Sequence, residues 1–172
     1  MADGTFAVLL LAFGLTDMAQ NHCGTDAGCL AGNDRQARFA ISAGEVLERR
    51  AQPAGEIYLR YDFGRGFGPF GTAAGLSVGE KGELWMGYGV TYELTRPDTP
   101  YFAELHLMPG LYAPNDGFDL GGPLEFRSGI EFGYETRSGV RFGLAYDHRS
   151  NADIFAQNPG IETVQLRVSF PM

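Results

Sequence analysis

Residues 140–150 read VRFGLAYDHRS, and residues 162–170 read ETVQLRVSF. From Val140 to Tyr146 and from Val164 to Phe170, large apolar side chains occupy the even positions and polar or small ones the odd positions. Successive side chains of a β-strand point to opposite faces. Each stretch therefore predicts a strand with one apolar face and one polar face.

The same alternation extends from this hairpin through most of the chain. From residue 37 onward, no segment shows a 3.6-residue apolar period, and Gly, Pro, Asn and Asp separate the alternating runs, as is typical of hairpin connections. The expected strands are residues 38–47, 56–63, 70–78, 83–94, 101–111, 124–136, 140–150 and 162–170. We divide the chain into an N-terminal extension, residues 1–36, and a barrel domain, residues 37–172.

The composition of the polar faces indicates whether they line the lumen of the barrel or its exterior. These faces are rich in glycine and contain both Arg and Glu, whereas Lys81 is the single lysine of the chain. Glycine relieves crowding in a narrow lumen, and Arg and Glu can pair there, while a soluble exterior would carry more lysine. We therefore predict an all-β protein, an eight-stranded antiparallel transmembrane β-barrel. A soluble eight-stranded ligand carrier is the alternative.

Length and charge exclude other classes of protein. The chain has 172 residues, enough for one domain, and 44% of them are hydrophobic, too many for a disordered chain. Its 13 Lys and Arg against 21 Asp and Glu give a formal charge of −8, which argues against nucleic acid as a partner. The longest apolar stretch is too short for a conventional transmembrane helix. No nucleotide motif or metal cluster is present, and we expect no cofactor and no bound metal.

The apolar run Phe6–Met18 has no place in an even-numbered barrel, so we leave it outside. Phe6–Leu15 has the length of the apolar region of a signal peptide, but Met1–Thr5 contains Asp3 and no Lys or Arg. A mis-started signal peptide, an atypical one and a segment of the mature protein remain open. 

Two cysteines, Cys23 and Cys29, follow in a glycine-rich stretch. A small disulfide loop is the favoured interpretation for two cysteines at this spacing. Free thiols and a metal site that recruits His22 are the alternatives.

Three polar residues break the apolar face of the last two strands. His148 and Ser150 continue the even positions after Tyr146, and Glu162 opens the even positions of the next strand. A polar group that faces lipid is costly unless it has a partner. A serine, a histidine and a carboxylate on one face can act as nucleophile, general base and orienting acid. Polar residues of a barrel rim that contact lipid headgroups are the alternative, whereas His106 falls on the lumen face.

The segment FGLAYDHRSNADIFAQNPGIETVQLRVSFP, residues 142–171, resembles the C-terminal hairpin of the lipid A 3-O-deacylase (PagL-type) family. That family has an H-x-S-N element, followed by an Asn and a G-x-E element on the next strand. Weaker similarity extends to MPGLY, residues 108–112, and GGPLEFRSG, residues 121–129. The residues that match the motif are His148, Ser150, Asn151, Asn158, Gly160 and Glu162.

The resemblance implies an eight-stranded outer-membrane barrel with its active site on the lipid-facing wall. Ser150 resembles the nucleophile, His148 the general base and Glu162 the acid that orients it. Asn158 resembles the side chain that helps to stabilise the oxyanion, and Asn151 resembles a supporting scaffold residue.

The implied substrate is the ester-linked 3-hydroxyacyl chain at position 3 of lipid A, within lipopolysaccharide. The implied partners are outer-membrane lipids, and a homodimer or a membrane complex is left open. A barrel that keeps the motif but serves as a structural or binding subunit of a membrane assembly is the alternative function.

Overall fold

The computed structural model describes residues 4–47, 53–94 and 98–172. Met1–Asp3, part of the segment considered above as the start of a signal peptide, lie outside the described residues. The elements, in chain order, are α1 (Thr5–Asp17), a π-helical turn (Met18–His22), β1 (Gly32–Asp34), β2 (Arg38–Leu47), β3 (Ala54–Phe67), β4 (Phe70–Gly79), β5 (Leu84–Glu93), β6 (Tyr101–Ala113), β7 (Leu124–Glu135), β8 (Arg141–Ser150) and β9 (Ile161–Pro171).

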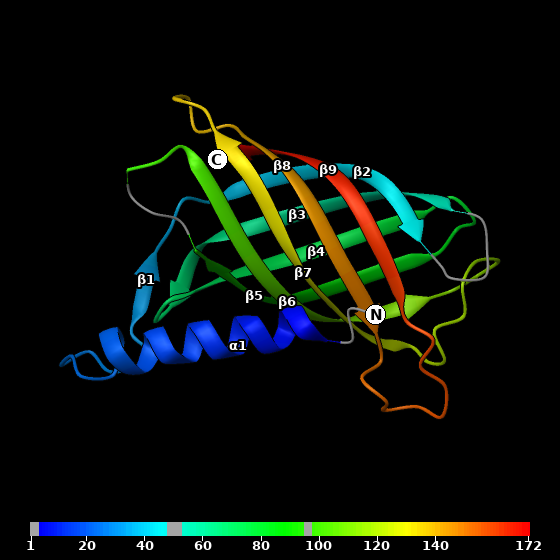
Figure 1. The fold of residues 1–172 in the computed structure, drawn as a ribbon, viewed down its shortest axis with the longest axis horizontal. Coiled ribbons are helices and arrows are strands. Elements are labelled where there is room, and N and C mark those ends of the chain that lie inside the picture. Colours follow the sequence, from blue (N-terminus) through cyan, green and yellow to red (C-terminus); the bar gives the residue numbers. More distant parts are fainter. Residues whose placement is uncertain (1–3, 48–52, 95–97) are drawn as a thin grey trace.

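Strands β2 to β9 close into an eight-stranded antiparallel barrel, which confirms the predicted fold (Figure 1). Each strand pairs with its neighbour in the sequence, and β2 pairs with β9 to complete the ring. Closure gives every barrel strand a hydrogen-bonded neighbour on both sides, as strands in a lipid environment require. The short β1, which the alternation did not predict, pairs antiparallel with the last residues of β3.

Strand β3 is longer than the predicted residues 56–63 and runs from Ala54 to Phe67. A register shift between Asp62 and Gly66 interrupts its pairing with β4. A Cβ atom on Gly66 would lie 2.0 Å from the backbone oxygen of Phe70, so only glycine allows the two strands to approach this closely. The alternation ends at this irregular point because the pleat is no longer regular.

The apolar faces point outward and the polar faces point into the lumen. Among the exposed large apolar side chains are Ile57, Met86, Phe132, Leu144 and Leu166, one from each of five strands. An apolar wall with a charged interior is the arrangement of a membrane barrel and the reverse of a soluble carrier. In the described residues, no helix is both long and apolar enough to cross a membrane.

Charged groups fill the lumen in a connected network centred on Glu56. One carboxylate oxygen of Glu56 accepts hydrogen bonds from Arg127 at 2.9 Å and from Gln165 at 2.8 Å, and the other accepts one from Arg149 at 2.5 Å. Arg127 also donates to Asp147 at 2.7 Å. These five residues are almost completely buried, so each charge depends on its partners for stabilisation.

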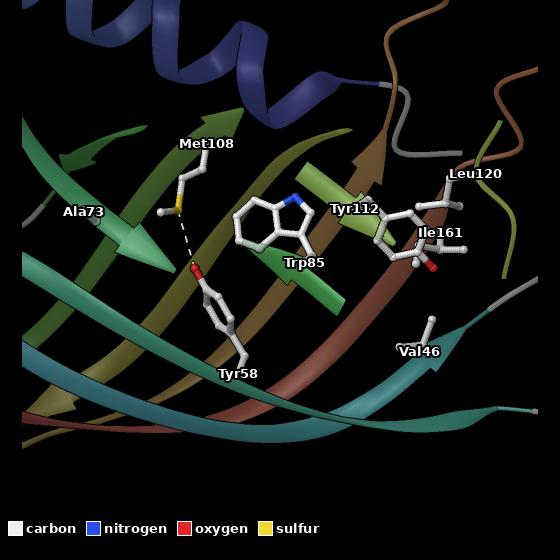
Figure 2. Packing of buried hydrophobic residues seen from close by; sticks show 8 residues of the cluster. All are labelled: Val46, Tyr58, Ala73, Trp85, Met108, Tyr112, Leu120 and Ile161. Carbon is white, nitrogen blue, oxygen red and sulfur yellow. Dashed lines mark hydrogen bonds between the residues drawn. The ribbon is translucent and has the colours of Figure 1, made fainter. Parts of the chain in front are cut away.

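Aromatic and aliphatic side chains fill the rest of the interior. Figure 2 shows Tyr58, Trp85 and Tyr112 inside the barrel, with the Tyr58 hydroxyl directed at Met108. The Tyr58 oxygen lies 3.4 Å from the Met108 sulfur, and the Arg127 guanidinium lies 3.9 Å from the centre of the Tyr58 ring. The lumen is thus a packed mixture of ion pairs and rings.

Helix α1 lies along the outer wall of the barrel, outside the strands, as expected for the run Phe6–Met18 (Figure 1). Leu10 packs between the helix and the wall with Phe70 and Leu105, while Val8 and Leu15 on other sides of the helix are exposed. A helix that is apolar all round is suited to an apolar environment on every side. The structure also contains the Cys23–Cys29 disulfide, which bears out the favoured interpretation of the two cysteines.

The two ends of the barrel differ in their connections. Arg38 at the start of β2 pairs with Pro171 at the end of β9, so the barrel begins and ends at the same end, called here the terminal end. Short turns at residues 68–69 and 136–140 lie at this end. The longer connections, residues 114–123 and 151–160, lie at the opposite end, called here the long-loop end.

We expect Glu56→Ala to lower the free energy of unfolding by about 3–5 kcal/mol, because it leaves buried Arg127 and Arg149 without their shared carboxylate. Urea unfolding in lipid vesicles, followed by the fluorescence of the single tryptophan, Trp85, measures the loss. Asp116→Ala, in an exposed position of a loop, is the control. Equal stability of the two variants would contradict the role given to the network.

Candidate functional site

The polar residues predicted for the apolar face lie together at the long-loop end of β8 and β9. Along β8, Asp147 and Arg149 point into the lumen and join the Glu56 network. The residues that alternate with them, His148 and Ser150, therefore belong to the outer face, as the sequence alternation predicted. The ion pairs in the lumen therefore fix β8 from its inner side, while its outer face carries His148 and Ser150.

His148 and Glu162 form a hydrogen-bonded pair across two strands. They are directly opposite each other in the ladder of β8 and β9, and His148 Nδ1 lies 3.0 Å from Glu162 Oε1. The His148 side chain is only 10% exposed and that of Glu162 is 23% exposed. With Nδ1 engaged by the carboxylate, the ring orientation is fixed, and Nε2 is the nitrogen that can accept a proton.

Two serines flank His148 on the outer face. Ser150 lies two residues further along β8 and is partly exposed, whereas Ser128 lies directly opposite His148 on β7 and is only 3% exposed. Within the described ranges, no hydrogen bond joins either hydroxyl to the imidazole. A nucleophile must be reached by substrate, so accessibility favours Ser150. Sequence reasoning passed over Ser128, although its even number placed it on the same face.

The connection after β8, residues 151–160, is held by two asparagines. Asn151 is fully buried, and its side-chain amide donates to the carbonyl of Leu120 at 2.8 Å and to that of Gln157 at 2.7 Å. The side-chain oxygen of Asn158 accepts a hydrogen bond from the Asn151 backbone at 3.0 Å. Asn151 therefore ties this connection to the neighbouring one, residues 114–123.

Asn158 has donor capacity beyond its contacts inside the loop. Its amide nitrogen donates to Asp153 at 3.0 Å, and a side-chain amide carries two hydrogens. The second hydrogen is available for a further acceptor. The register of β8 does not extend into the loop, so alternation could not have placed this residue.

Gly160 lies close to the edge of the His148 imidazole. Its φ of +63° is in the left-handed region, and a Cβ atom there would lie 3.1 Å from His148 Cε1 and 3.8 Å from Nε2. Glycine adopts this backbone conformation without strain and leaves the space beside the ring open. Sequence reasoning named Gly160 only as a supporting residue of the motif. Its backbone conformation and its contact with His148 explain why a glycine suits this position.

Tyr146 is a further residue of this surface, which sequence reasoning counted only as an apolar member of β8. It lies two residues before His148 on the outer face of β8 and pairs with Val164 of β9, two residues after Glu162. The sequence did contain a signal for this residue: Tyr146 and Glu162 have even numbers, as His148 has, and the even positions of these two strands share one face. His106, by contrast, lies in the lumen, 3.4 Å from Asp147, as expected.

The arrangement has the parts of an acid–base and nucleophilic centre: a hydroxyl, an imidazole held by a carboxylate, and amide donors nearby. For the part of the chain that the structure describes, no group of three or more His, Cys, Asp or Glu residues is placed to hold a metal ion. The chemistry that these side chains support on their own is acyl transfer.

Comparisons with known proteins show the family and the fold. The family model of lipid A 3-O-deacylase (PagL) matches residues 48–171. A crystal structure of the outer membrane enzyme PagL is similar, with 21% sequence identity, a TM-score of 0.61, and coverage of 78% of this chain and 99% of that chain. The comparison with curated proteins found no match.

Two further solved structures have the same kind of barrel. A designed transmembrane β-barrel has 10% identity and a TM-score of 0.57, and covers 81% of this chain and 98% of its own. The crystal structure of Neisserial surface protein A (NspA) has 9% identity and a TM-score of 0.55, and covers 82% of this chain and 99% of its own. At these identities the likeness concerns the fold.

We expect Gly160→Ala to destabilise the protein more than Gly82→Ala does. Both glycines have positive φ, but a Cβ atom on Gly82 would meet only ordinary contacts at 3.9 Å, whereas one on Gly160 would press on His148. Backbone strain costs each variant about 1 kcal/mol, and Gly160→Ala adds a steric cost. Urea unfolding in lipid vesicles compares the two, and equal losses would contradict the close packing of Gly160 on the ring.

Proposed function

The chain belongs to the lipid A 3-O-deacylase (PagL) family, and from this premise we propose that it removes the ester-linked 3-hydroxyacyl chain at position 3 of lipid A by a Ser150–His148–Glu162 mechanism. It is an enzyme family of the bacterial outer membrane, and the chain lies in that membrane. The observation that carries the proposal is the 3.0 Å hydrogen bond between His148 and Glu162 on the lipid-facing wall. If His148 and Glu162 only stabilised the barrel as a polar pair, they would not need to lie outside the lumen.

The position of the site along the membrane normal supports lipid A as the substrate. Outer-membrane barrels have short turns on the periplasmic side and longer loops on the outside, so the long-loop end faces the cell exterior. His148 and Ser150 lie at that end of β8, beside the connection of residues 151–160. Lipid A belongs to the outer leaflet, so its ester bonds lie at this level.

The first half of the reaction is the transfer of the acyl chain to the enzyme. His148 Nε2 takes the proton of the Ser150 hydroxyl as its oxygen attacks the ester carbonyl, and Glu162 stabilises the imidazolium that forms. The tetrahedral intermediate then expels the sugar hydroxyl of lipid A, to which His148 returns the proton. Ser150 is left as an acyl ester.

The second half repeats these steps with water. His148 takes a proton from a water molecule that attacks the acyl-Ser150 carbonyl, and the fatty acid leaves as the Ser150 hydroxyl regains its proton. The products are a free 3-hydroxy fatty acid and an underacylated lipid A. Atoms balance with one water consumed.

The oxyanion that forms in both halves needs hydrogen-bond donors. The resemblance to the family assigns this role to Asn158, and the second hydrogen of its amide is consistent with that role. One donor of this kind contributes about 3 kcal/mol to lowering the barrier. Asn151 contributes indirectly, because it anchors the loop that carries Asn158.

We expect Ser150→Ala to lower fatty acid release from lipid A by at least about a thousandfold, because it removes the nucleophile. Ser128→Ala is the matched control, since it deletes the other hydroxyl beside His148 and should keep most of the activity. Both purified variants are assayed on lipid A in mixed micelles after heat-modifiable gel mobility has confirmed that the barrels are folded.

The reverse result, with Ser128→Ala inactive and Ser150→Ala active, would move the nucleophile to β7. If the folded wild type and both variants all release no fatty acid, the esterase proposal is wrong. The chain would then be a family member that works as a structural or binding subunit.

We expect Glu162→Ala to be less severe and to leave about a hundredfold more activity than Ser150→Ala, because the imidazole keeps its basicity and loses only its orientation. Initial rates of both variants on the same substrate measure the difference. Equal inactivity would show that the carboxylate does more than orient the ring.

A further inference from the structure

Helix α1 begins on the outer wall beside the site, next to β8 (Figure 1). Phe6, in the first turn of the helix, packs edge-to-face on Tyr146 of β8, with the ring centres 5.7 Å apart and the planes at 65°. Tyr146 precedes His148 by two residues on the same outer face. The first turn of α1 therefore contacts a residue that lies about 7 Å along the strand from His148.

The rest of the helix is attached to the wall towards the terminal end of the barrel. Gly14 is buried against Phe70, the first residue of β4, and a Cβ atom on Gly14 would lie 2.2 Å from Cε1 of that ring. The Tyr92 hydroxyl, near the end of β5, donates to the Asp17 carboxylate at 3.1 Å. The helix is thus a fixed part of the outer wall, and it extends from the terminal end to the neighbourhood of the site.

Two rows of apolar side chains follow the site on the outer face of β7, β8 and β9, in the direction of the terminal end. The members of the first row are paired across the strands and half-buried: Ile130, Tyr146 and Val164. The members of the second row are exposed: Phe132, Leu144 and Leu166. Ile130 packs against the cluster that contains Leu10 of α1, and Tyr146 packs against Phe6. The start of α1 therefore borders the first row and leaves the second row open.

The acyl chain of the substrate has to cross this surface. The long-loop end faces the cell exterior, so the interior of the membrane lies towards the terminal end. The outer-face positions from Ser150 through His148 to Tyr146 lead in that direction. An acyl chain whose ester carbonyl lies at Ser150 thus extends past His148 and reaches Tyr146 and Phe6. Phe6 is only half-buried, so part of its ring is free to contact the chain.

We propose that the first turn of α1 is part of the acyl-chain binding site: Phe6, seated on Tyr146, contacts the 3-hydroxyacyl chain on the membrane side of the ester and favours long chains over short ones. This inference rests on the proposed function and deepens it. It gives a specificity-determining role to a helix that lies outside residues 48–171, the part of the chain that the family model matches.

The size of the expected effect follows from the surroundings of the chain. Lipid is as apolar as a phenylalanine ring, so the chain gains no hydrophobic transfer energy when it leaves lipid for the protein. What it gains is van der Waals packing on a fixed surface, which also orients the ester towards Ser150. Packing of this kind changes rates several-fold, and only for chains long enough to reach Phe6.

The first test compares a long and a short ester, para-nitrophenyl dodecanoate and butanoate, in detergent micelles. Phe6→Ala should lower kcat/KM for the dodecanoate about fivefold and leave the butanoate unchanged, because the short chain ends before it reaches Phe6. Val8→Ala, on the exposed side of the same helix, is the matched control and should behave as the wild type on both esters. The butanoate rate also reports whether the triad of the Phe6→Ala variant is intact.

An equal loss on both esters, or no loss on the dodecanoate, would overturn the inference. The intact mass of the purified wild type is measured first, and a mature chain that lacks residues 5–17 would overturn it as well.

A second readout does not depend on turnover. Ser150→Ala, which leaves the ester intact, is placed in vesicles with lipid A whose 3-hydroxyacyl chain carries a diazirine group in its middle. After illumination, mass spectrometry of the peptides locates the cross-links. Phosphatidylcholine with a diazirine at the same depth measures general contact with lipid.

The lipid A probe should label the first turn of α1 and the outer face of β8 more strongly than the phosphatidylcholine probe does. The same distribution of cross-links for both lipids would overturn the acyl-chain site even if the enzyme is active. A wild type that hydrolyses neither the esters nor lipid A, but whose Ser150→Ala variant shows this enrichment, would instead contradict the proposed function alone.

Discussion

The carboxylate of Glu56 holds three other strands to β3 from inside the barrel. It binds Arg127 of β7, Arg149 of β8 and Gln165 of β9, and all four side chains are buried. A narrow lumen that contains charges is stable only when every charge has a partner. The alternation of the strands then leaves the opposite face of each strand apolar, as the membrane requires.

The site depends on this internal network because it uses the other face of the same strands. Arg149 lies between His148 and Ser150 in the sequence, and its attachment to Glu56 fixes the backbone that presents both. Catalytic groups on a rigid strand are more precisely placed than groups on a loop. Asn158 lies instead in the connection of residues 151–160, which Asn151 ties to residues 114–123.

The period of two made most of the barrel predictable from the sequence. It gave the eight strands, their inward and outward faces, and the shared face of His148, Ser150 and Glu162, because register and parity are local properties. The hydrogen bond between His148 and Glu162 followed, since both residues lie on the apolar face of adjacent strands, and adjacent strands of a barrel turn their apolar faces to the same side. Ser128 was within reach of the same reasoning and was missed only because it lay on another strand.

Other features depend on contacts between distant segments, which alternation does not encode. Helix α1 is apolar all round, so no periodic face identified it as a helix or indicated which wall it covers. Its attachment through Phe6 to Tyr146 joins residues separated by most of the chain. The bonds from Asn151 to Leu120 and Gln157 likewise arise from the folding of two irregular loops onto each other.

Mass spectrometry of lipid A tests the central claim most directly, in cells whose lipid A carries the 3-hydroxyacyl ester at position 3. Cells expressing the chain should yield lipid A lighter by one 3-hydroxyacyl group than cells with the empty vector. Lipid A of unchanged mass, with the folded barrel present in the outer membrane, would contradict the assignment of this site to ester hydrolysis.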